Sequence, residues 1–225
     1  MINKIGISLL VLLSFSCDKE IQNTAKQEAK QDSTQDKQNS EDYLCIPYKK
    51  VGKILPTHTY ADLEKIFDKK NVRIDTMIWD GTITGYYTYV KVTPTQELQV
   101  YWQEGLPPYK TIEMIKITTK SDKFKTIEGI GAGSTLADLV KVNNGKPFKF
   151  SGFEWENGGG CCKDTQKGFL GGINTLSLQL PTNDSKVFSE QERSEIFGDQ
   201  LVSSDLPVFE KFMPTVDAIY IYMNK

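Results

Sequence analysis

The residues best suited to chemistry gather in one stretch, residues 154–163. Gly158-Gly159-Gly160 has the look of a phosphate-binding loop, but the Gly-Lys-Ser/Thr ending and the helix that such a loop needs do not follow it, so a turn is the better interpretation. Glu154 and Glu156 would share one face of a strand, where paired carboxylates could serve glycoside hydrolysis. Alternation with the neighbouring aromatic residues explains both acids as a solvated strand face, and we predict no catalytic site.

The first residues of the chain indicate export. Lys4 supplies a basic start, and Ile5–Leu13 is an apolar run too short to cross a bilayer as a helix. Small residues then precede Cys17, an arrangement that resembles the lipobox of bacterial lipoproteins. The resemblance implies that residues 1–16 are a signal peptide and that Cys17 carries lipid, including palmitate, which anchors the protein in the bacterial cell envelope. Of the two membranes, we favour the outer one over the inner one. The alternative is an ordinary secretory signal cut near Ser16, or a plain N-terminal anchor.

Residues 17–45 form the expected tether. Between Asp18 and Asp42 the only large apolar residue is Ile21, so this stretch buries too little surface to fold and should stay a disordered linker. A coil of that length reaches roughly 25–30 Å. The formal net charge of the chain is −2, and the sequence contains no block of basic or acidic residues. Both features argue against a nucleic-acid partner.

Three cysteines besides Cys17 remain, and an exported chain is in a compartment that permits disulfides. We expect Cys45 to be bridged to Cys161 or Cys162, which would tie the first residues of the folded part to a distant loop. The competing interpretation is a redox or metal pair at the two adjacent cysteines. Metal sites need clustered ligands, however, and the single histidine, His58, precedes a predicted helix in a surface loop. We therefore predict no metal and no cofactor.

One short pattern occurs twice in the chain. Residues 59–66 read Thr-Tyr-Ala-Asp-Leu-Glu-Lys-Ile, and residues 135–142 read Thr-Leu-Ala-Asp-Leu-Val-Lys-Val. In each copy the threonine suits a helix N-cap, and the aspartate three residues later can bond back to the cap amide, as in a capping box. Each copy therefore predicts the start of a short amphipathic helix.

Strand-like segments rich in β-branched and aromatic residues follow each predicted helix. They are residues 72–79, 84–92, 97–103 and 111–118 after the first helix, and 148–155, 172–180 and 216–222 after the second. Short turns between them favour antiparallel pairing. We predict an α+β fold of two tandem units, 46–122 and 123–225, each with a helix on one face of an antiparallel sheet, and a helical insertion at 185–214. One helix over four strands buries little alone, so the units should share an interface or one continuous sheet.

This order of elements resembles a known architecture. A glycine-containing run, Thr-x-Ala-Asp-Leu, a helix and a curved meander are similar to the tandem repeat of β-lactamase-inhibitor-protein-like domains, and to the single-repeat outer-membrane assembly lipoproteins of the small-protein-A type. The matching elements are residues 59–67 and 135–145 with the strands after them. In such folds the sheet face commonly binds another protein. The resemblance therefore implies a non-catalytic binding or inhibitory module.

Aromatic residues provide the candidate binding surface. Tyr87 and Tyr89 share a strand face, and Tyr86 lies on the opposite face. If one helix covers one side of the sheet, the second side is either a contact between the units or a recognition surface. Tyrosine and tryptophan are favoured at protein interfaces, although packing inside the protein also explains many of them. The candidate binding residues are Trp79, Tyr87, Tyr89, Trp102 and Trp155.

Taken together, these features predict a membrane-tethered lipoprotein of the cell envelope. Its expected partner is another envelope or extracellular protein, which it would bind as an inhibitor or an assembly factor without catalysing a reaction. The alternative is a lipoprotein that binds a carbohydrate or another small ligand on its aromatic strand faces.

Overall fold

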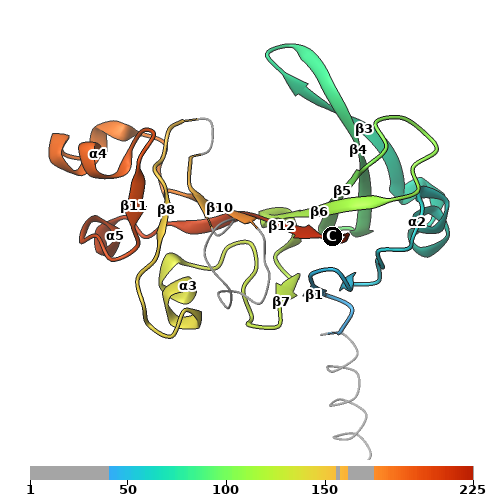
Figure 1. The fold of residues 1–225 in the computed structure, drawn as a ribbon, viewed down its shortest axis with the longest axis horizontal. Helices are drawn as coiled ribbons and strands as arrows, with labels where there is room; N and C mark the ends of the chain where they lie inside the picture. The colour runs from blue at the N-terminus through green and yellow to red at the C-terminus, as the bar shows by residue number, and fades with distance from the viewer. Residues whose placement is uncertain (1–40, 156–157, 162–174, 225) are drawn as a thin grey trace, which may run out of the picture. The chain divides into compact units, whose positions relative to one another are not determined.

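The computed structural model describes residues 41–155, 158–161 and 175–224, and its main feature is a seven-stranded antiparallel sheet (Figure 1). In spatial order the strands are β3 (Val72–Trp79), β4 (Thr82–Thr93), β5 (Gln96–Trp102), β6 (Ile112–Thr118), β12 (Thr215–Tyr222), β10 (Thr175–Gln179) and β9 (Gly160–Cys161). Because β6 and β12 are neighbours, strands from both predicted units form one continuous sheet. The predicted signal peptide, Cys17 and residues 18–40 of the predicted linker lie outside the described residues. The end of that linker was placed too late, because Leu44 and Cys45 already belong to strand β1 (Leu44–Ile46) and Cys45 is buried.

Two smaller sheets and several short helices accompany the large sheet. One small sheet has the order β2 (Lys50–Val51), β1 (Leu44–Ile46), β7 (Lys125–Thr126), and the other pairs β11 (Leu201–Ser203) with β8 (Lys149–Ser151). The α-helices of the described part are α2 (Tyr60–Phe67), α3 (Leu136–Val142), α4 (Glu190–Ile196) and α5 (Val208–Lys211), and its 3-10 turns are η1 (Lys69–Asn71), η2 (Thr119–Ser121) and η4 (Ser185–Val187). None of the helices in these residues is long and apolar enough to cross a bilayer.

The repeated pattern forms two capped helices, as predicted. At α2 the Thr59 amide donates to the Asp62 carboxylate at 3.1 Å, and the Asp62 amide donates back to the Thr59 hydroxyl. The corresponding bonds at α3 join Thr135 and Asp138 at 2.9 and 3.1 Å. Hydrogen bonds from the Thr59 hydroxyl and amide lower the Asp62 pKa to about 2. Each box satisfies amides that would otherwise be unpaired at the helix start, which typically contributes about 1 kcal/mol.

The core lies on one face of the large sheet. Leu63 of α2 and Leu139 of α3 are fully buried in the same cluster as the inward-facing strand residues, which include Val90, Leu98, Val100, Ile115, Ile117, Ile219 and Ile221. Registers such as Val90↔Leu98 and Ile117↔Ile219 place these side chains opposite one another on a single face. Each fully buried aliphatic side chain contributes roughly 1.5–3 kcal/mol, so this face accounts for most of the apolar stabilisation of the sheet.

One strand prediction after α3 differs from the structure. The predicted strand 148–155 is only the three residues of β8, which pair with β11 instead of joining the large sheet. It ends because Gly152 packs closely against the backbone of Gly198, and Glu154 adopts a positive φ of 58°. Glu154 therefore lies in a bend and not in a strand, while Glu156, the second acid of the predicted strand face, lies outside the described residues.

Candidate functional site

The outer face of the large sheet is a half-exposed surface rich in tyrosine. Alternation along the strands turns one set of side chains to the core and the other set outward. The outward set on β4, β5, β6 and β12 includes Tyr87, Tyr89, Gln99, Tyr101, Met114, Lys116, Tyr220 and Tyr222, all of them partly exposed. Cross-strand registers Tyr89↔Gln99, Gln99↔Lys116 and Tyr220↔Lys116 place them side by side. We call Tyr87, Tyr89, Tyr101, Tyr220 and Tyr222, with the polar side chains between them, the tyrosine face.

Aromatic contacts order the middle of the tyrosine face. The rings of Tyr87 and Tyr101 are stacked with their centroids 5.6 Å apart. On the next strands the Lys116 ammonium lies 5.5 Å from the centroid of Tyr220, and Tyr222 is opposite Met114. Stacked rings and cation–π contacts hold these side chains in place, so little side-chain entropy would be lost when a partner binds.

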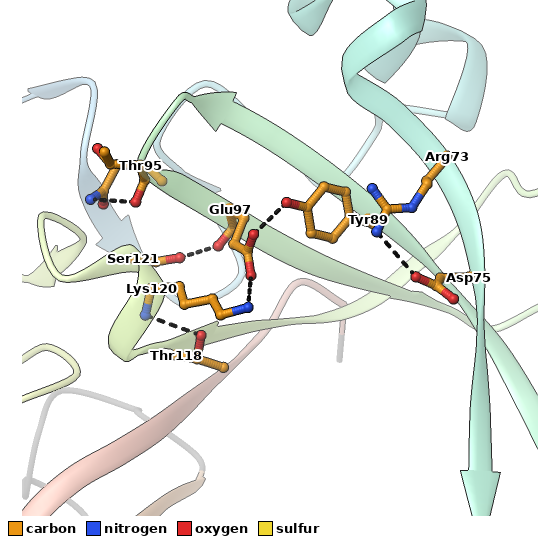
Figure 2. A network of polar contacts seen from close by, with 9 residues as sticks. Arg73, Asp75, Tyr89, Thr95, Glu97, Thr118, Lys120 and Ser121 are labelled. Carbon is orange, nitrogen blue, oxygen red and sulfur yellow. Dashed lines mark hydrogen bonds and ion pairs between the residues drawn. The ribbon is translucent and has the colours of Figure 1, made fainter.

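A polar network fixes the part of the face nearest to β3 (Figure 2). The Arg73 guanidinium lies 3.8 Å from the centroid of Tyr89 and donates to the Asp75 carboxylate at 3.3 Å. The Tyr89 hydroxyl donates to Glu97, which also pairs with Lys120 at 3.1 Å. Charges in this corner are thus neutralised in pairs, and the tyrosine ring stands between them.

Burial and hydrogen bonding change the acidity of the tyrosines. Burial raises the pKa of Tyr101 to about 12, with smaller contributions from Tyr220 and Tyr87. Burial, and then the Asp75 carboxylate, raises the pKa of Tyr87, whereas the hydrogen bond to Glu97 is the main cause of the raised pKa of Tyr89. These phenols therefore stay neutral donors over the whole physiological pH range.

Alkaline titration should reveal this face. The unfolded chain releases its phenol protons near pH 10, whereas Tyr87, Tyr89 and Tyr101 hold theirs to higher pH in the folded chain. The folded state then binds more protons, so stability should fall as the pH rises from about 10 through about 12. Phenolate absorbance of the folded chain, with the denatured chain as reference, measures the shift. Tyr101→Phe should remove the highest step, and identical folded and denatured titrations would contradict the assignment.

The predicted aromatic candidates do not all lie on this face. Tyr87 and Tyr89 do, and Trp79 is 68% exposed at the end of β3. Trp102 is among the predicted binding residues, but it is 7% exposed, donates from its indole to the Thr88 hydroxyl at 2.8 Å and stacks on Tyr109. Trp102 is therefore a core residue, and that prediction is wrong. Trp155 is half-buried, and its indole nitrogen has no hydrogen-bond partner within the described part of the chain.

Sequence reasoning missed the contribution of the last strand. Tyr220 and Tyr222 alternate with Ile219 and Ile221, which are buried. That alternation could have identified them as a face. Only the pairing of β12 with β6 shows that they extend the surface made by Tyr87 and the strands of the first half.

The cysteine predictions are partly overturned. Cys45 is buried as a free thiol, and burial raises its pKa to about 12, so the predicted bridge from Cys45 is wrong. Cys161 is disulfide-bonded, while Cys17 and Cys162 lie outside the described residues. His58 accepts a hydrogen bond from the Leu55 amide at 3.1 Å and so stabilises a turn. Within the described residues, no group of three or more possible metal ligands comes together.

Two cavities in the described part of the chain lie away from the tyrosine face. One of about 320 Å³ lies beside the end of α2 and is lined by Asp42 and Lys53, which pair at 3.1 Å, and by apolar residues that include Phe67 and Leu98. Another, of about 430 Å³, lies between α4 and α5. None of the described residues that line these two cavities belongs to the tyrosine face.

The fold defines this chain as a mixed α+β protein with a mostly antiparallel sheet and one half-exposed, tyrosine-rich sheet face. Comparison with known protein families, curated proteins and solved structures gave no match to the chain.

Proposed function

We propose that this protein is a lipid-anchored lipoprotein of the bacterial cell envelope that binds another protein through its tyrosine face, as an inhibitor or assembly module, without catalysing a reaction. The single observation that carries the proposal is the row of preorganised aromatic and polar side chains across β4, β5, β6 and β12. Tyrosine is enriched at interface hot spots because one rigid ring supplies both apolar area and a hydrogen-bonding group.

The finer architecture is also proposed. In it, α2 with β3 to β6 and α3 with β8 to β12 are two tandem units. The matched capping boxes of α2 and α3 support this arrangement. So does the central pairing of β6 with β12, the last strand of each unit.

The membrane attachment rests on the sequence around Cys17. The lipidated cysteine and a polar linker up to residue 40 would hold the folded part away from the bilayer and leave the tyrosine face free to meet its partner. In the same cells, Cys17→Ala should release the protein from the membrane fraction, because the acyl chains supply the affinity for the bilayer. Tight attachment of that variant would refute the lipid anchor.

Adjacent tyrosines offer a matched test of binding. Tyr87 lies on the tyrosine face, and Tyr86, the preceding residue of β4, points to the opposite face. Three full-length proteins are compared: the wild type, Tyr87→Ala and Tyr86→Ala. Each is cross-linked to its partners in the cell envelope and then purified. We expect one protein to be recovered in stoichiometric amount with the wild type and with Tyr86→Ala, and roughly tenfold less with Tyr87→Ala, the loss typical of a moderate hot spot.

Two results would contradict the proposal. One is the absence of any stoichiometric protein partner, including the case in which only glycan is recovered, as the alternative of carbohydrate binding requires. The other is an equal loss of the partner in both variants. Circular dichroism of each variant provides the control for folding.

A further inference from the structure

The hairpin of β3 and β4 projects beyond the rest of the sheet (Figure 1). The pairing of β4 with β5 spans Thr88 to Thr93, so residues 82–87 have β3 as their main strand neighbour. Five large apolar residues of this hairpin are exposed: Ile74, Ile78, Trp79, Ile83 and Tyr86. Ile78, Trp79 and Ile83 are 64%, 68% and 54% exposed, far more than the residues of the tyrosine face, and such a cluster marks an interaction surface.

The outer edge of this hairpin has no neighbouring strand among the described residues. β3 is the first strand of the sheet and is eight residues long. The Thr76 amide donates to the Asp75 carboxylate at 2.9 Å, while the Met77 carbonyl accepts from the Thr84 hydroxyl of β4. Thr76 therefore points away from β4 and Met77 points toward it. Since peptide groups alternate along a strand, Ile74, Thr76 and Ile78 present their backbone donors and acceptors at the free edge.

We propose that β3 pairs antiparallel with β3 of a second copy of this chain, about a twofold axis at Thr76, because β3 is an edge strand in the described part of the sheet and its side-chain sequence is complementary to itself. This inference uses the sheet edge and is independent of the function proposed for the tyrosine face.

The complementarity follows from the register. With Thr76 opposite Thr76 of the second copy, Ile74 faces Ile78 and Ile78 faces Ile74, so both apolar pairs form on one face. The three outward-pointing residues would exchange about six backbone hydrogen bonds across the axis. On the other face Arg73 lies opposite Trp79, where a cation–π contact is favourable.

Neighbouring registers are worse. Moving the axis to Asp75 sets two carboxylates opposite each other, which is destabilising. Moving it to Ile74 sets Met77 and Trp79 opposite η1, which is no longer extended. The axis at Thr76 is the register that keeps β3 paired with strand along nearly its whole length and puts no like charges face to face.

The charges on β3 do not oppose this contact. Arg73 and Asp75 are paired with each other at 3.3 Å, so the edge carries no net charge from them. In the dimer the carbonyl of the second Thr76 replaces the Asp75 carboxylate as acceptor for the Thr76 amide. The two sheets then continue into one another, and the Trp79 of one copy extends the row of Arg73 and Tyr89 of the other.

Site-directed disulfide formation tests the register in the full-length chain in membranes. Thr76→Cys should give a reducible dimer on mild oxidation, because a hydrogen-bonded antiparallel pair brings the two Cα atoms to about 5.5 Å, within disulfide range. The matched control is Thr95→Cys, which makes the same replacement in the exposed turn between β4 and β5. We expect several-fold more dimer from Thr76→Cys than from Thr95→Cys.

A second variant tests the contact without a cysteine. Ile78→Lys removes both apolar pairs and brings two ammonium groups into the contact, so light scattering of the detergent-solubilised chain should show dimerisation weakened by about tenfold or more. Ile78 is largely exposed, so its replacement should leave the fold intact, which circular dichroism checks. Equal cross-linking at Thr76 and Thr95, or a wild-type chain that stays monomeric at all concentrations measured, would overturn the proposal, even if β3 paired with a different protein.

Discussion

Replacing Trp102 by alanine should lower the free energy of unfolding by about 3–5 kcal/mol, the range for removing a large aromatic side chain from a core. Trp102 is 7% exposed and stacks on Tyr109 with ring centroids 5.6 Å apart. Its loss would leave a cavity and would also remove the donor to the Thr88 hydroxyl, which is itself fully buried. Denaturant unfolding followed by circular dichroism measures the difference.

The chain supplies the control for this variant. Trp79→Ala makes the same replacement at a residue that is 68% exposed, and it should change stability by no more than about 0.5 kcal/mol. If the two variants were equally destabilised, the placement of Trp102 in the core would be wrong. Any loss of association in Trp79→Ala with unchanged stability would instead point to the projecting hairpin.

Gly159→Ala should lower the free energy of unfolding by about 4 kcal/mol or more, a loss that few single substitutions cause. It should also disrupt the edge of the sheet at β9. Gly159 has a positive φ of 71°, and an added Cβ would overlap the carbonyl oxygen of Leu178 on β10. The Gly159 amide also donates to the carbonyls of Ser151 and Gly152, and its own carbonyl accepts from the Leu178 amide at 2.9 Å. Backbone must therefore move on both sides of the glycine.

Gly145→Ala separates the backbone conformation from the clash. Gly145 has nearly the same φ, 72°, but none of the described heavy atoms beyond its chain neighbours lies within 4 Å of the position that an added Cβ would take. Only left-handed strain of about 1–2 kcal/mol is therefore expected. Thermal unfolding of both variants measures the difference between them. Equal melting temperatures would show that the close approach of Gly159 to Leu178 is not a constraint on the fold.

Short-range features of this protein were predictable from the sequence. The capping boxes at Thr59 and Thr135 were correct because they involve atoms three residues apart. The four strands of the first half were placed to within a few residues, since β-branched and aromatic runs with turn residues between them act locally. The strand predicted after Phe148 was too long, because the close contact of Gly152 with the Gly198 backbone and the positive φ of Glu154 end it. The alternation of apolar and polar residues does not reveal either feature.

The candidate site was only half predictable, as Tyr101 and Trp102 show. Alternation requires that these adjacent residues point to opposite faces of β5, but it does not say which face is covered. Elements distant in the sequence, such as α2, pack against one face of the sheet. Trp102 lies on that face and is part of the core, whereas Tyr101 lies on the outer face. The same holds for Cys45, whose burial as a free thiol depends on neighbours far along the chain.

The repeated helix starts, the alternating strands and the α+β class were thus determined by the sequence alone, because each depends on residues close together in the chain. The single tyrosine face was not, because it exists only when β12 pairs with β6 and brings Tyr220 beside Lys116. Burial and strand pairing depend on contacts between residues about a hundred positions apart in the sequence. The spacing of neighbouring residues therefore does not predict them.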